Sequence, residues 1–164
     1  MTIDLHMFTL IHVVLSVLGI ILGLVVVGGL IANVRLDRWI AGFLVTTILT
    51  SLSGFGFHTD SLTPAKIVGA LSLVLLAVCL VARYGRLHQG RWRAVFIVTA
   101  VASLYLNVFV LIVQLFAKTP ALALLAPTQK EPPFVVTQVL IVALFVWLGR
   151  AALRSFRAIA PRRS

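Results

Sequence analysis

Cysteine, acidic residues and charge of either sign are scarce in this sequence. Cys79 is the single cysteine among 164 residues, and Asp and Glu together number four. One cysteine cannot form an internal disulfide, and without paired Cys-x-x-Cys spacing the chain has neither a zinc ribbon nor a thioredoxin-like motif. Charged residues make up 11% of the chain, against roughly 25% in an average soluble domain. The composition therefore excludes a soluble globular domain, a disordered chain and a disulfide-stabilised secreted scaffold.

Apolar residues dominate the chain instead, at 61% of the sequence with a mean hydropathy of +1.13. A hydrocarbon core of about 30 Å needs about 20 helical residues, and five apolar runs of this length are present. The predicted spans are residues 8–30, 39–57, 64–82, 92–116 and 133–153. The longest remaining stretch, 117–132, is too short for a soluble domain. We therefore predict a single all-α transmembrane domain, a polytopic helical bundle over residues 1–164.

Basic residues concentrate on one side of the predicted bundle. Eleven of the fourteen Lys and Arg residues fall in 33–38, in 83–93 and in the tail from residue 150. The positive-inside rule then places the amino terminus on the outer, periplasmic side and the carboxyl terminus in the cytoplasm. Because long apolar runs separate these residues, the net charge of +10 indicates contact with anionic lipid head groups rather than with nucleic acid.

Small and polar residues share one face on each of the first two spans. They are His12, Ser16, Gly19 and Gly23 on the first span, and Thr47, Ser51, Gly54 and His58 on the second. Residues spaced three and four apart lie on one side of a helix, and small residues let helix backbones approach each other in lipid. We therefore assign Gly19, Gly23 and Gly54 to helix packing. Since consecutive spans are antiparallel, His12 and His58 both fall in the outer leaflet.

Further polar side chains fall in the outer half of the fourth and fifth spans. The full set of candidate ligand-pocket residues is His12, Ser16, Ser51, His58, Asn107, Gln114, Glu131 and Gln138. Intramembrane polar residues either fasten helices together or line a wet cavity.

Three hypotheses account for these residues. In the first, they fasten helices, and the protein is an assembly or accessory component with a membrane-protein partner or a second copy of itself. In the second, they line an outer pocket that holds a small polar ligand or relays protons. In the third, His12 and His58 ligate haem or, with a carboxylate, a metal ion. The sequence identifies no cofactor and no catalytic motif, so an enzyme is disfavoured.

The segment between the last two spans contains several prolines. Thr119-Pro120 followed by an apolar run that stops at Pro127 predicts a helix of one or two turns, too short to span the bilayer. The following prolines predict a stiff loop that holds Glu131 in one place. Glu131 either stabilises the amino terminus of the fifth span through its helix dipole or points into the pocket.

Four stretches carry a resemblance to known proteins. They are Leu49 to Phe55 (LTSLSGF), Thr63 to Gly69 (TPAKIVG), Tyr105 to Val110 (YLNVFV) and Leu125 to Phe134 (LAPTQKEPPF). The chain resembles a group of small, uncharacterised multi-span inner-membrane proteins of Gram-negative bacteria. The resemblance implies a bacterial inner-membrane location with a periplasmic outer side, and it implies no activity and no site residue.

Overall fold

The computed structural model describes residues 5–56, 64–85 and 90–159. Over these residues the chain is helical and contains no strand, as predicted. The helices are α1 (Leu5–Ile31), α2 (Asp37–Phe55), α3 (Pro64–Leu80), α4 (Arg91–Lys118), α5 (Pro120–Leu125) and α6 (Pro132–Ile159), and a π-helical turn, Val81–Gly85, extends α3. Among the described helices, five are long and apolar enough to cross a membrane. They match the five predicted spans to within a few residues, and α5 is the predicted short helix.

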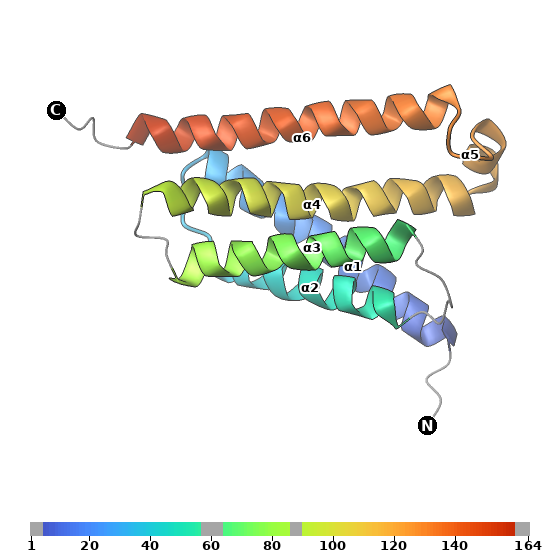
Figure 1. The fold of residues 1–164 in the computed structure, drawn as a ribbon, viewed down its shortest axis with the longest axis horizontal. Coiled ribbons are helices and arrows are strands. Elements are labelled where there is room, and N and C mark those ends of the chain that lie inside the picture. The colour runs from blue at the N-terminus through green and yellow to red at the C-terminus, as the bar shows by residue number, and fades with distance from the viewer. Residues whose placement is uncertain (1–4, 57–63, 86–89, 160–164) are drawn as a thin grey trace.

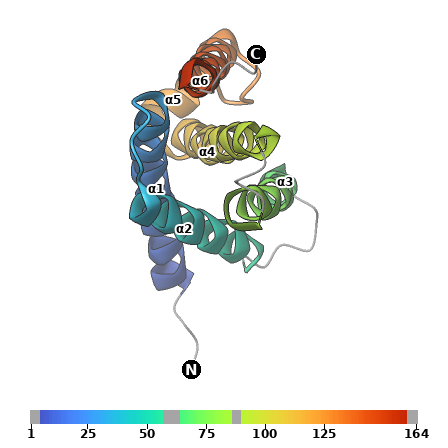
Figure 2. The ribbon, with the colours of Figure 1, turned by 90° about the vertical axis from the view of Figure 1, so that its left-hand side faces the viewer.

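Consecutive long helices run in opposite directions, so the bundle has two distinct ends (Figure 1). One end, called here the α5 end, holds the start of α1 and α3, the end of α2 and α4, and α5. The other, called here the arginine end, holds the 32–36 connection and the end of α6. Helix α4 lies at the centre, where it packs against α1, α3 and α6 (Figure 2).

Local chemistry explains where the helices start and stop. Helices α3, α5 and α6 each begin at a proline, which lacks only an N–H that a first turn does not use. Helix α1 ends in a Schellman motif, in which Asn33 adopts a positive φ of 54°. The N–H of Val34 donates to the Gly29 carbonyl and the N–H of Asn33 donates to the Leu30 carbonyl, which satisfies two carbonyls that the helix end would leave open.

The larger of the two apolar clusters fills the arginine half of the bundle. Its most deeply buried side chains include Val26, Phe43, Leu76, Ile97 and Leu104. At the arginine end, an ion pair joins Arg83 to Asp37, and the Ser155 hydroxyl donates to the Ile31 carbonyl at 2.6 Å, which ties α6 to the end of α1. This half of the bundle is therefore closed by packed side chains.

Candidate functional site

The α5 half of the bundle contains a cavity of about 480 Å³ between α1, α2, α3 and α4. Small-molecule sites typically enclose roughly 300 to 1,000 Å³. Figure 1 shows α1 and α2 diverging from α4 toward this end, which opens the space. The polar residues that line it are Thr9, His12, Ser16, Thr50, Ser51, Lys66, Ser72, Asn107, Gln114, Lys118 and Thr119. The rest of the wall is mostly apolar and includes Val13, Val68, Leu106, Val110 and Leu111.

Asn107 fixes the floor of the cavity by joining α4 to α1. The Ser16 hydroxyl donates to Asn107 Oδ1 at 2.8 Å, and Asn107 Nδ2 donates to the Ser16 backbone carbonyl at 3.4 Å. Asn107 is buried, and burial of an amide in apolar surroundings is costly unless it is hydrogen-bonded. The pair therefore sets the spacing of α1 and α4 at the depth where the apolar core gives way to the cavity.

His12 joins the α1 wall to α2. Its Nδ1 lies 2.7 Å from the Ser53 hydroxyl, and that hydroxyl donates its single proton to the Thr50 carbonyl at 3.0 Å. Which of the two groups donates in the His12–Ser53 hydrogen bond depends on the tautomer of the imidazole ring. A matching bond joins α2 to α3, where the Ser51 hydroxyl donates to Ser72 Oγ at 3.2 Å.

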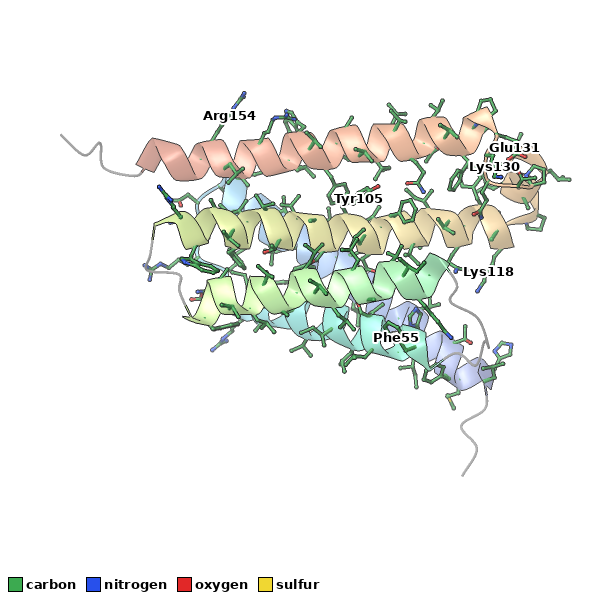
Figure 3. All side chains as sticks on the ribbon, viewed as in Figure 1. Phe55, Tyr105, Lys118, Lys130, Glu131 and Arg154 are labelled. Atoms are coloured by element: carbon green, nitrogen blue, oxygen red, sulfur yellow. The ribbon has the colours of Figure 1, made fainter. Side chains whose placement is uncertain are left out.

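Two lysines bring positive charge to the cavity. Lys66 lies in the first turn of α3 and Lys118 in the last turn of α4, and both line the cavity. Figure 3 shows Lys118 at the end of α4 on the side of α3. The structure describes two acidic residues, Asp37 and Glu131, and neither lines the cavity. The described lining therefore carries cations without carboxylates.

Beneath the floor, two buried hydroxyls have no hydrogen-bond partner in the part of the chain that the structure describes. They belong to Thr47, which is 1% exposed, and to Ser103, which is fully buried. Gly19 faces this region, because a Cβ built on it would lie 3.1 Å from Asn107 Nδ2 and 3.2 Å from Thr47 Oγ1. The absence of a side chain at Gly19 thus lets α1 approach the polar atoms of α2 and α4.

The structure brings five of the predicted pocket residues to this cavity and separates two others from it. His12, Ser16, Ser51, Asn107 and Gln114 line it, as does Gly54. Gln138 and Glu131 do not, because α6 packs on the side of α4 away from the cavity. His58 lies outside the described residues.

Gln138 instead borders an apolar groove between α4 and α6, together with Phe109 and Phe134. Both of its side-chain polar atoms are buried and have no hydrogen-bond partner within residues 5–56, 64–85 and 90–159. A buried amide without a partner costs about 1 to 3 kcal/mol. The side chain therefore destabilises the α4–α6 contact unless another group reaches it.

Glu131 holds the loop that leads into α6. Its Oε1 accepts from the Thr128 hydroxyl at 2.8 Å and from the Thr128 N–H at 3.2 Å, and its Oε2 accepts from the Lys130 N–H at 3.0 Å. Desolvation acts to raise the pKa of the Glu131 carboxyl, but these hydrogen bonds outweigh it and hold the pKa below its ordinary value. Gln129, which adopts a positive φ of 58°, donates from Nε2 to the Val113 carbonyl at 3.0 Å and fastens the loop to α4.

Lys66, Lys118 and Ser72 are cavity residues that the sequence did not single out. Lys66 and Lys118 are basic residues on the side that the positive-inside rule leaves poor in charge, which is a signal that would have found them. Among the described residues, no cluster of three or more His, Cys, Asp or Glu side chains is placed to hold a metal ion.

No protein-family model, curated protein or solved structure matches the chain. A functional conclusion therefore depends on the geometry of the cavity itself.

Proposed function

We propose that this protein binds a small amphiphilic ligand in the cavity at the α5 end. The cavity is the observation that carries the proposal, because four helices supply it with a mostly apolar wall and a few convergent polar groups. This combination is characteristic of small-molecule sites. An apolar chain fits the wall formed by residues such as Leu106 and Val110, and the polar part of the ligand meets His12, Gln114 and the lysines.

We further propose that the cavity opens on the periplasmic side of a bacterial inner membrane. The arginine end carries Arg35, Arg38, Arg91 and Arg93, whereas the α5 end carries Lys66, Lys118 and Lys130. This asymmetry supports a cytoplasmic arginine end under the positive-inside rule. Alkaline phosphatase fused after residue 131 is expected to be active and the same enzyme fused after residue 163 inactive, and the reverse pattern would overturn the orientation.

The closed arginine half favours binding over conduction. Phe43, Leu104 and Ile97 are among the side chains that fill the bundle below Asn107, so the cavity ends blindly. A blind cavity holds a ligand but offers no passage to the other side in this conformation. The two bonds that brace it, Ser16 to Asn107 and His12 to Ser53, add a preformed shape, which lowers the entropic cost of binding.

The assembly hypothesis has a different observation in its support. The unpartnered amide of Gln138 sits in the apolar α4–α6 groove, and amide side chains hydrogen-bond across helices in membranes. On this second proposal, the Gln138 side chain turns outward to a partner helix that packs in the groove, and that helix supplies the missing bond. Gln138→Leu would then abolish co-purification or oligomerisation while leaving the cavity unchanged.

A pair of glycine variants tests the ligand proposal. Among the described residues, a Cβ on Gly54 meets only His12 Cε1, at 3.8 Å, so Gly54→Leu is expected to fold and to place its side chain in the cavity. Gly28 is the matched control, because a Cβ there meets nothing within 4 Å and the position is exposed. In neutral nanodiscs, medium-chain amphiphiles should raise the Tm of wild type and of Gly28→Leu. Equal stabilisation of Gly54→Leu would overturn the proposal.

A further inference from the structure

Helix α6 is the least covered of the five long helices. Only 6% of the residues in its most apolar stretch are buried within the described chain, against 22% to 50% in the other four. It packs on α4 and α1, and Figure 2 shows it at the outer edge of the bundle. The rest of its surface is free to contact lipid or another protein.

Four valines form a stripe along this outer surface. Val135, Val139, Val142 and Val146 line the apolar groove between α4 and α6, and each is 41% to 60% exposed. Their spacing of four, three and four residues is the 3.5-residue repeat of a left-handed helix pair. Valine has one strongly preferred χ1 rotamer in a helix, so little side-chain freedom is lost when a second helix packs on the stripe.

Gln138 lies beside this stripe and needs both a donor and an acceptor. Neither its Nε2 nor its Oε1 has a hydrogen-bond partner in the described ranges 5–56, 64–85 and 90–159. A lipid chain offers neither kind of group. A second Gln138 offers both, because each amide carries N–H donors and a carbonyl acceptor and the two can bond reciprocally.

Two copies of the chain meet this requirement by symmetry. Identical chains insert into a membrane in the same orientation, so a two-fold axis that relates them runs along the membrane normal. Each residue of α6 then lies at the same depth in both copies, and the interface uses the same patch twice. An unrelated helix would satisfy Gln138 only if it carried a suitable polar residue at this one depth.

The charge at the arginine end limits how far such a contact extends. Arg150 is exposed and follows Val146 by four residues, so it continues the stripe. Two copies in contact there would bring like charges together. The contact therefore covers the part of α6 from Val135 to Val146, which includes Gln138.

We infer that the helix that packs in the α4–α6 groove is α6 of a second copy of this chain. The two copies form a parallel two-fold dimer, in which the Gln138 side chains turn outward and hydrogen-bond to each other. This inference rests on the assembly proposal, since it names the partner of the same groove. It is independent of the ligand cavity, because Gln138 and the valine stripe do not line that cavity.

The association of labelled protein in liposomes tests the role of the amide. Photobleaching steps count the chains per particle over a series of protein-to-lipid ratios. Gln138→Leu should need about threefold to thirtyfold higher protein density than wild type to become half dimeric, the effect of losing hydrogen bonds between membrane helices. The variant should still fold, because the amide is unpartnered in the separate chain. Gln114→Leu, which removes an amide that lines the cavity instead, is the matched control and should dimerise like wild type. Equal dimerisation of Gln138→Leu and wild type would overturn the inference.

Cross-linking locates the interface. In a Cys79→Ala background, Val139→Cys places a thiol on the stripe, and Leu140→Cys places one at the next position, about 100° around the helix. These two side chains are 60% and 64% exposed, so their reactivity toward a maleimide should be similar. An oxidant should link Val139→Cys into a dimer and leave Leu140→Cys monomeric. Equal cross-linking of the two variants would contradict the proposed packing.

The inference and the assembly proposal fail differently. Wild type that stays monomeric at every density, with no Val139→Cys cross-link, would refute the second copy as the partner. The assembly proposal would still stand if wild type then co-purified in a fixed ratio with a different membrane protein that Gln138→Leu loses. Absence of both a dimer and such a partner would refute the two together.

Discussion

The contact at Gly23 provides a sharp test of how α1 packs. A Cβ built on Gly23 would lie 2.6 Å from Leu104 Cδ1 and 2.9 Å from Phe43 Cε2. Both neighbours are among the most deeply buried side chains of the core, so neither has free space into which to move. Gly23→Ala therefore adds one methyl group to a region that is already filled.

The magnitude follows from two opposing effects. Overpacking a dense core costs about 1 to 3 kcal/mol, while alanine is favoured over glycine within a helix by about 1 kcal/mol. The matched control is Gly28→Ala, five residues along the same helix, where the new Cβ meets nothing within 4 Å. Since helix propensity changes equally in both variants, their difference isolates the steric cost. We expect Gly23→Ala to be less stable than Gly28→Ala by about 1 to 3 kcal/mol.

The assay is reversible unfolding in mixed micelles, followed by helical circular dichroism, with both variants measured under identical conditions. Gly28→Ala should match or exceed the wild-type stability. Gly23→Ala should fall below Gly28→Ala by the stated difference. Equal stabilities for the two variants would show that α1 does not approach Phe43 and Leu104 as described, and would refute the packing argument.

Three further predictions concern polar groups. Thr47→Val replaces an unpartnered buried hydroxyl by a methyl group. The free energy of unfolding of this variant in micelles should therefore equal or exceed that of wild type. A loss above about 1 kcal/mol would show that the hydroxyl has a hydrogen-bond partner. Gln138→Leu removes an unpartnered buried amide and should raise stability by about 1 to 3 kcal/mol, whereas a decrease would show that the amide is satisfied. Because the pKa of Glu131 is lowered in the folded protein, its contribution is present above the ordinary value of 4.5 and is lost as the pH falls through the lowered folded value. In wild type, hydrogen exchange at the Thr128 and Lys130 amides should therefore accelerate on acidification, relative to the rest of the chain. In Glu131→Gln, exchange at these amides should be fast already at neutral pH. Equal protection of these amides in both proteins would contradict the role of the carboxylate.

The long helices could be predicted from the sequence because their signal is local. A run such as 92–116 is predominantly apolar, and in a membrane such a run has to satisfy its backbone groups internally as a helix. The short α5 was predictable for a similar reason, since Pro120 and Pro127 limit it on both sides. Composition and proline placement therefore determine these elements without reference to tertiary contacts.

The shared face of His12 and Ser16 was predictable from helical spacing, but its partners were not. Ser16 bonds Asn107, which is 91 residues away, and no spacing rule gives the rotation of α4 that brings the two together. For the same reason, the spacing of residues did not predict the position of Gln138. Its polarity suggested a place in the pocket, yet it faces Phe109 on the other side of α4. Which side of α4 receives α6 is set by tertiary packing rather than by periodicity.

Glu131 shows a second limit of sequence reasoning. The prolines around it indicated a stiff loop, and the structure shows the carboxylate holding that loop through Thr128 and Lys130. The side-chain direction depends on the turn at Gln129, whose positive φ is uncommon for a residue other than glycine. No local sequence pattern indicates that turn, so the sequence could not decide between a role at the amino terminus of the fifth span and a place in the pocket.

The most direct test of ligand binding is native mass spectrometry of protein purified from its own host in mild detergent. We expect wild type and Gly28→Leu to carry one amphiphile per chain, and Gly54→Leu to carry none, because the leucine side chain occupies the cavity beside His12. An identical bound mass in Gly54→Leu, or no bound molecule in wild type even after incubation with decanoate or decanol, would contradict the proposal that this cavity is a ligand site.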